Sequence, residues 1–180
     1  MRVIAGTAGG LTLVAPRGDG TRPITDRVKE TLFGILGERV PGARVLDLYA
    51  GSGAVGIEAL SRGAEHATFV ERGREALAAL GTNLERTGLA GLASVVSADV
   101  ERFLAAAPGG PWDLVVLDPP YAERAIVTPL RDLRPHLAPG AMVVLKHHWR
   151  SEVPDVADLP TSRQRRFGET MLTFMEATNR

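Results

Sequence analysis

The spacing of hydrophobic positions predicts a short extension before residue 44 and an alternating α/β core after it. The runs RVIAG and LTLVA flank the turn-like TAGG, which predicts a small hairpin within residues 2–15. After the polar segment 17–23, hydrophobic residues recur at helical spacing and predict an amphipathic helix over 26–40. Thr25 is a suitable N-cap for this helix, and the Pro-Gly pair at 41–42 ends it.

From residue 44 onward, short hydrophobic runs alternate with segments of helical periodicity. The strand-like runs are RVLDLY, HATFVE, SVVSAD, WDLVVLD, MVVLKH and TMLTFME. The helical segments are 54–62, 73–87, 100–107 and 123–136. Buried strands that alternate with helices are typical of a parallel, doubly wound sheet. The last strand-like run, 170–176, follows no helix, so we expect it to pair antiparallel within a hairpin.

Length and composition favour a single domain in a reducing compartment. The 180 residues fit one domain, 1–180, with an extension over 1–43 and a core over 44–180. The absence of cysteine excludes disulfides, Cys-ligated zinc and iron–sulfur clusters, and it suits the cytoplasm. Glycines and an arginine interrupt the hydrophobic residues at the start, so we expect neither a signal peptide nor a membrane span.

Charge is balanced over the chain but unevenly distributed. The 21 basic and 21 acidic residues argue against a general coat for nucleic acid. Residues 1–44, however, hold seven basic and four acidic side chains, and Arg163, Arg165 and Arg166 form a second basic cluster. Either cluster alone is typical of a solvated surface. If both flank one active site, they would form a track for phosphates.

A glycine-rich segment between the first strand and the first core helix predicts a cofactor site. Gly51, Gly53 and Gly56 form G-x-G-x-x-G, which lets the backbone approach a ligand at the start of a helix. Glu71 ends the next strand, 20 residues after Gly51, where a carboxylate can accept both hydroxyls of a ribose.

Three interpretations of this segment compete: a tight turn without ligand, a dinucleotide site, and a site for S-adenosylmethionine. Spacing alone fits NAD. Asp47, just before the glycines, would repel a pyrophosphate but can hold the methionine ammonium of S-adenosylmethionine. Asp99 ends the third strand and could accept from the adenine amine, cap the following helix, or do both.

The segment LDPPYAE at 117–123 predicts the site of chemistry. Its prolines end the fourth strand at the crevice that the glycine segment faces. Methylation of an aromatic amine builds positive charge on nitrogen, which the carboxylate of Asp118 and the carbonyl of Pro119 can stabilise as acceptors. Tyr121 can stack on the base. The alternative is a plain strand terminator with a surface tyrosine.

Three segments together resemble the RsmD family. They are RPITDRVKETLFGIL at 22–36, LDLYAGSGAVGIEALSRGA at 46–64 and DPPY at 118–121, and the opening RVIAG and closing RRFGETMLTFME fit as well. Members of this family are bacterial methyltransferases that modify the N2 amine of a guanine in small-subunit (16S) ribosomal RNA. The resemblance implies a Rossmann-like α/β fold with a mostly parallel seven-stranded sheet and an antiparallel C-terminal strand. It further implies S-adenosylmethionine as cofactor and 16S ribosomal RNA as partner. The modest net charge favours RNA within a small-subunit particle, and nothing in the sequence suggests an obligate dimer, so we expect a monomer.

The resemblance also assigns roles to individual residues, with no metal site among them. The expected catalytic residues are Asp118, Pro119, Pro120 and Tyr121. The expected cofactor residues are Asp47, Tyr49, Ala50, Gly51, Ser52, Gly53, Glu71, Arg72, Asp99 and Val100. The expected RNA-facing residues are Arg22, Thr25, Arg27 and Thr31, together with Arg163, Arg165 and Arg166.

One segment departs from the family, and several alternatives stay open. The family often has acidic residues after the fifth strand, where this chain has KHHWR at 146–150. We expect this change to affect RNA docking and to leave the chemistry intact. Arg27 could instead pair with Glu30 or Glu38. The alternative functions are a DNA or protein-glutamine methyltransferase, an NAD-dependent oxidoreductase, and an RNA-binding protein without activity.

Overall fold

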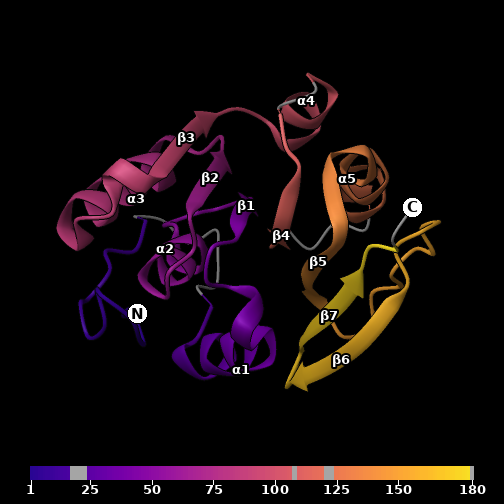
Figure 1. Ribbon diagram of the computed structural model, residues 1–180, viewed down its shortest axis with the longest axis horizontal. Helices are drawn as coiled ribbons and strands as arrows, with labels where there is room; N and C mark the ends of the chain where they lie inside the picture. Colours follow the sequence, from indigo (N-terminus) through magenta and orange to yellow (C-terminus); the bar gives the residue numbers. More distant parts are fainter. Residues whose placement is uncertain (17–23, 107–108, 120–123, 179–180) are drawn as a thin grey trace.

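A seven-stranded mixed sheet in the order β3-β2-β1-β4-β5-β7-β6 forms the centre of the structure (Figure 1). The computed structural model describes residues 1–16, 24–106, 109–119 and 124–178. Five strands are parallel, whereas β7 runs antiparallel to both β5 and β6, which confirms the expected fold class and hairpin. The strands are β1 Arg44–Leu48, β2 His66–Glu71, β3 Ala93–Ser97, β4 Trp112–Leu117, β5 Leu137–His148, β6 Thr161–Phe167 and β7 Thr170–Glu176.

Helices cover both faces of this sheet. Figure 1 shows α1, α2 and α3 on one face and α4 and α5 on the other. Their bounds are α1 Asp26–Leu36, α2 Ala54–Ser61, α3 Arg74–Thr87, α4 Val100–Ala105 and α5 Arg124–Leu133, with 3-10 turns at Gly37–Arg39, Ala90–Leu92 and Arg134–His136. Successive residues of each strand point to opposite faces. Accordingly Val45 belongs to one hydrophobic cluster, and Leu46 and Leu48 belong to the other. No helix in the described ranges is long and apolar enough to cross a membrane.

Three predicted elements differ in extent from the observed ones. The expected helix over 26–40 ends at Leu36, because Gly37 takes a positive φ of 50° and a 3-10 turn follows. The segment 123–136 likewise divides into α5 and a 3-10 turn. Strand β5 begins at Leu137, five residues before the predicted run at 142, because its first residue already pairs with Trp112 of β4.

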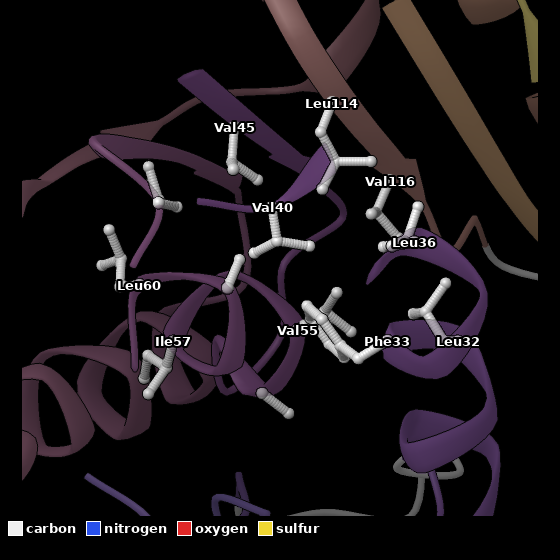
Figure 2. Packing of buried hydrophobic residues seen from close by; sticks show 14 of the residues in the cluster. Leu32, Phe33, Leu36, Val40, Val45, Val55, Ile57, Leu60, Leu114 and Val116 are labelled. Carbon is white, nitrogen blue, oxygen red and sulfur yellow. The ribbon is translucent and has the colours of Figure 1, made fainter. Parts of the chain in front are cut away.

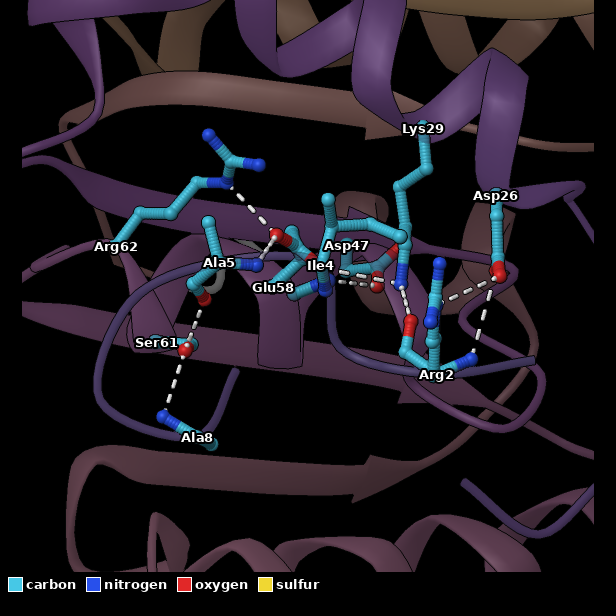
Figure 3. Close-up of polar contacts among 11 residues, drawn as sticks. Arg2, Ile4, Ala5, Ala8, Asp26, Lys29, Asp47, Glu58, Ser61 and Arg62 are labelled. Atoms are coloured by element: carbon cyan, nitrogen blue, oxygen red, sulfur yellow. Dashed lines mark hydrogen bonds and ion pairs between the residues drawn. The ribbon is translucent and has the colours of Figure 1, made fainter. Parts of the chain in front are cut away.

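The predicted N-terminal hairpin is reduced to one isolated antiparallel bridge between Arg2 and Thr12. Val3 donates to the Leu11 carbonyl at 2.9 Å and Leu13 donates to the Met1 carbonyl at 3.0 Å, so the two arms do lie together. Other backbone amides of the segment bind side chains of α2. Ile4 and Ala5 donate to the carboxylate of Glu58, and Ala8 donates to the hydroxyl of Ser61. The segment therefore lies against α2 and does not form a regular strand pair (Figure 3).

Glu58 is the centre of this attachment (Figure 3). Its side chain and that of Lys29 in α1 are both fully buried, and Oε2 lies 3.0 Å from the Lys29 ammonium. Arg62 Nε donates to Oε1 at 2.7 Å, and Lys29 also donates to the carbonyl of Arg2. A single buried carboxylate thus joins the N-terminal segment, α1 and α2.

Helix α1 runs along the sheet with its N-terminal end toward the carboxyl ends of the strands. Leu32, Phe33 and Leu36 pack in the same cluster as Leu114 and Val116 of β4 (Figure 2). At the other end, Arg39 donates to the Gly140 carbonyl near the start of β5 and pairs with Glu176 at 2.9 Å. The direction of α1 follows from these two contacts.

Loss of the buried Lys29–Glu58 pair should lower the free energy of unfolding much more than loss of the exposed Arg39–Glu176 pair. Glu58→Gln leaves the ammonium of Lys29 without its carboxylate in the core, which costs about 3–5 kcal/mol. Arg39→Ala removes an exposed pair with Glu176 and should cost about 0–1 kcal/mol. Urea denaturation measures both free energies of unfolding. Equal losses in the two variants would show that Glu58 does not attach the N-terminal extension.

Candidate functional site

The glycine segment forms a tight loop between β1 and α2. Tyr49, Gly51 and Gly53 have φ values of 60°, 57° and 78°. For a tyrosine this conformation is unusual and strained. At Gly53 a Cβ atom would lie 2.3 Å from Leu80 Cδ1, so this position needs both the conformation and the small size of glycine. Ala50 donates to the Val70 carbonyl at 3.1 Å, which holds the loop beside β2.

Asp47 lies beneath this loop as a buried carboxylate. Its Oδ2 accepts from the amide of Gly56 at 2.9 Å. Helix α2 can approach this closely because Gly56 has no Cβ. A Cβ there would lie 2.3 Å from the Phe69 ring and 3.1 Å from Asp47 Oδ2. Burial raises the pKa of Asp47 to about 8, against the Gly56 hydrogen bond, and the charges of Asp118 and Glu71 raise it further.

Glu71 connects the glycine loop to the end of β2. Its carboxylate accepts from the amides of Gly51 at 2.9 Å, Arg72 at 2.8 Å and Gly73 at 2.7 Å. A carboxylate has about four acceptor positions. The two shorter bonds occupy Oε1, so Oε2 retains one position for a further donor.

Asp99 and Tyr49 lie at the neighbouring edge of the site. Asp99 caps α4 by accepting from Glu101 N at 3.0 Å, which confirms the predicted capping role, and it pairs with Arg72 at 3.1 Å. Its contact with adenine stays a prediction.

Tyr49 is half-buried. Burial, and after it the charges of Asp99 and Glu101, raise the pKa of Tyr49 to about 12. Val100 is buried at the start of α4.

Asn83 of α3 supports the loop and was missed by the sequence analysis. Its buried amide donates to the Ser52 carbonyl and to the Val14 carbonyl, each at 2.9 Å, and its Oδ1 accepts from Val14 N at 2.7 Å. The signal was present in the sequence. Asn83 occupies the buried stripe of α3 with Ala79, Leu80 and Leu84, where a polar residue needs a partner.

Asp118 directly follows the last residue of β4 that pairs with β1. Leu117 pairs with Leu48, and the Asp118 amide lies 3.4 Å from the Leu48 carbonyl. The expected position of Asp118 and Pro119 beside the glycine loop is therefore correct. Pro120 and Tyr121 lie outside the described residues, as does Arg22.

Lys146 of β5 contacts Asp118 closely, which the sequence analysis did not foresee. Its ammonium donates to Oδ1 at 2.7 Å and to Oδ2 at 2.6 Å. Burial raises the pKa of Asp118, and the charge and hydrogen bonds of Lys146 oppose that rise. The only signal in the sequence was the departure at 146–150, which we expected to affect RNA docking alone. Instead its first residue contacts a candidate catalytic residue.

Three carboxylates therefore stand at the carboxyl ends of adjacent strands. Asp47 belongs to β1, Glu71 to β2, and Asp118 follows β4. The charges of the latter two act on Asp47 strongly enough to raise its pKa. This edge of the sheet suits a ligand that brings positive charge and disfavours a pyrophosphate. Within the described part of the chain, no three His, Asp or Glu residues are grouped to hold a metal ion.

The candidate RNA residues lie on α1 and β6. Thr25 caps α1, Arg27 is exposed, and the Thr31 hydroxyl donates to the Arg27 carbonyl at 3.1 Å. Arg27 forms no ion pair with Glu30 or Glu38 in the described structure.

The arginines of the C-terminal cluster do not share one face of β6. Arg163 pairs with Phe174 of β7, and Arg165 pairs with Leu172, so both lie on the α1 face of the sheet. Arg166 points the other way, and its guanidinium lies 3.8 Å from the ring centroid of Trp149. A ligand on the α1 face would therefore contact Arg163 and Arg165 before Arg166.

Comparisons with known proteins show the family and the fold of this chain. The family model described as "Conserved hypothetical protein 95" matches residues 1–176. The chain is 42% identical over 176 residues to "Putative rRNA methyltransferase YlbH" of Bacillus subtilis, covering 94% of this chain and 95% of that protein. It is 39% identical over 158 residues to "Ribosomal RNA small subunit methyltransferase D" of Escherichia coli K12, covering 87% and 79%. The structure of "Putative methyltransferase yhhF from Escherichia coli" superposes with a TM-score of 0.90 at 33% identity, covering 100% and 99%.

Gly56 gives a test of the close approach between α2 and β2. Gly56→Ala places a methyl group against the Phe69 ring and Asp47, so we expect it to destabilise the fold by about 1–3 kcal/mol. Gly81→Ala in α3 meets nothing within 4 Å and should be neutral or stabilising by up to about 1 kcal/mol. Thermal unfolding distinguishes the variants. A Gly56→Ala protein as stable as Gly81→Ala would refute the packing argument.

The raised pKa of Asp47 gives a pH-dependent test. The folded-state pKa of about 8 lies above the ordinary value of 3.8, so ionisation of Asp47 removes stability as pH rises from about 4 to 8. Asp47→Asn avoids this loss and still offers an acceptor to Gly56. The melting temperature of the variant should therefore exceed that of the native chain by an amount that grows between pH 5 and 8.5.

The exposed Asp132 of α5 provides the matched control for this comparison. Asp132→Asn should give a difference from the native chain that does not change with pH. A pH-independent difference for Asp47→Asn as well would argue against a buried carboxylate with a raised pKa.

Proposed function

Since the chain belongs to the RsmD family, whose model is described as conserved hypothetical protein 95, we propose that it methylates a guanine N2 amine in small-subunit (16S) ribosomal RNA. The methyl donor is S-adenosylmethionine. Relatives named as rRNA methyltransferases at 42% and 39% identity support an RNA substrate. The observation that carries the proposal is the juxtaposition of Asp118 with the glycine loop across the β1–β4 pair.

The charges of the site support S-adenosylmethionine as cofactor. This molecule carries a sulfonium and an ammonium, and their positive charge would favour the ionised form of Asp47, whose pKa burial and the charges of Asp118 and Glu71 raise. Asp47 and the loop Gly51–Ser52–Gly53 would hold the methionine end, and Glu71 with its open acceptor position would bind a ribose hydroxyl. Asp99 would accept from the adenine amine, with Tyr49, Ala50, Arg72 and Val100 around it.

Asp118 would act on the amine of the bound base. Bound S-adenosylmethionine would supply the methyl group: the amine lone pair would form the N–C bond as the S–C bond breaks with its electrons on sulfur. Positive charge then passes to the nitrogen, which loses a proton to Asp118 or to water. The Asp118 carboxylate and the Pro119 carbonyl would accept the two N–H groups, so acceptors already in place stabilise the developing charge. Pro120 and Tyr121 would complete the base pocket, with Tyr121 stacked on the base.

The RNA would bind along the carboxyl edge of the sheet. The N-terminal end of α1 lies toward this edge, so Arg22, Thr25, Arg27 and Thr31 are the proposed contacts from the extension. Arg163, Arg165 and Arg166 on β6 would contact phosphates farther away. The amine must leave the base stack to reach Asp118, so we propose a looped-out nucleotide.

The proposal extends to the oligomeric state, the substrate particle and the location of the enzyme. The enzyme would act as a monomer and as one domain over 1–180, on RNA within a small-subunit particle in the cytoplasm. Among the alternatives, an NAD-dependent oxidoreductase would have to bind a pyrophosphate beside three carboxylates, which opposes it. A DNA or protein-glutamine methyltransferase has no specific observation in its favour.

Ligand binding and activity test the proposal in one set of samples. S-adenosylhomocysteine should raise the melting temperature, whereas NAD should not. Asp118→Ala should keep that shift and lose methyl transfer to unmodified small subunits by at least about 100-fold, since its acceptor is gone. Asp132→Ala on the exposed side of α5 should keep both. A shift with NAD alone, or full activity of Asp118→Ala, would overturn the proposal.

A further inference from the structure

Lys146 lies next to Asp118 because of the register between β4 and β5. Leu117 pairs with Leu145, so Asp118 and Lys146 are the next residues along two parallel neighbours. Alternation along each strand sends both side chains to the face that α1 and α2 cover. The ammonium contacts both carboxylate oxygens, at 2.7 and 2.6 Å.

Burial makes this contact different from a surface ion pair. The side chain of Lys146 is only 10% exposed, and that of Asp118 is 35% exposed. The chain also uses lysine sparingly. Of its 21 basic residues only Lys29 and Lys146 are lysines, and each is buried against a carboxylate. An ammonium is a compact point charge, and here its one nitrogen contacts both carboxylate oxygens of Asp118.

No other charged group named around Asp118 supplies it with the positive charge that Lys146 does. Asp47 on β1 is a carboxylate that Asp118 itself affects, and Glu71 on β2 lies beyond it. On the helical side, the ammonium of Lys29 is already bound to Glu58. Burial raises the pKa of Asp118, and Lys146 is the group that opposes this rise.

We propose that Lys146 is a positioning residue that keeps the Asp118 carboxylate ionised and oriented as an amine acceptor at neutral pH. The inference rests on the proposed function, since it assigns Lys146 a role in the same methyl transfer. Each carboxylate oxygen has two acceptor positions. Lys146 takes one position on each, and the other remains for the N–H of the base. The Lys146 ammonium thus orients the Asp118 carboxylate and leaves acceptor positions on it for the base.

The pH dependence of methyl transfer tests this role. Lys146→Gln removes the charge but keeps a donor, so the acidic limb of kcat should move up by about 1–3 pH units. Lys146→Arg restores a positive charge, and its acidic limb should lie near that of the native enzyme even if kcat falls. The KM for S-adenosylmethionine should change less than twofold in both variants. An acidic limb that does not move in Lys146→Gln would overturn the inference.

A direct titration separates failure of this inference from failure of the proposed function. Aspartate labelled with carbon-13 at the carboxyl group reports ionisation by NMR without any substrate, and Asp118→Asn assigns the signal. The Asp118 pKa should be higher in Lys146→Gln than in the native chain, and an unchanged pKa would refute the inference. If it rises while the native enzyme methylates no ribosomal RNA, the charge coupling stands and the substrate assignment fails.

Discussion

The pairing of β1 with β2 on one side and β4 on the other is the constraint on which the site depends. Parallel register brings the ends of the three strands to one edge, with Leu48 opposite both Val70 and Leu117. The residues just inside or beyond those ends are therefore forced together. They include Asp47, Glu71 and Asp118, three carboxyl groups close enough that the charges of Asp118 and Glu71 add to the raised pKa of Asp47. This is the edge of the sheet at which we propose that the methyl donor binds.

The two lysines of the chain are each buried against a carboxylate. Lys29 neutralises Glu58, which holds the N-terminal segment and α1 onto the core. Lys146 neutralises Asp118 at the end of β4. Asp47 has the Gly56 amide as a hydrogen-bond partner, and its pKa is raised to about 8. A ligand that brings positive charge to this place would favour the ionised form of Asp47.

Much of the fold could be predicted from periodicity, because the helices and strands alternate clearly after residue 44. The strands 66–71 and 170–176 were predicted to the residue. The two arms of the N-terminal hairpin do pair, through the Arg2–Thr12 bridge and the bonds of Val3 and Leu13, but they form no regular strands. The sequence does not reveal that Glu58 binds the amides of Ile4 and Ala5. Contacts between distant side chains were missed for the same reason.

In the site, too, features set by short motifs could be predicted, whereas contacts between distant residues could not. Motif spacing predicted that Asp118 would face the glycine loop. It could not predict the contact between Lys146 and Asp118, which depends on the β4–β5 register, nor the support that Asn83 gives to Ser52. Helix α1 is the feature of the sequence that favoured the RsmD family over other amino methyltransferases, and the family match over 1–176 bears this out.

The central claim is that this chain methylates a guanine N2 amine in small-subunit RNA. Nucleoside mass spectrometry of 16S ribosomal RNA from a strain lacking the gene tests it most directly. The account predicts that one N2-methylguanosine disappears and returns on complementation with the native gene but not with Asp118→Ala. An unchanged N2-methylguanosine content in the deletion strain would contradict it.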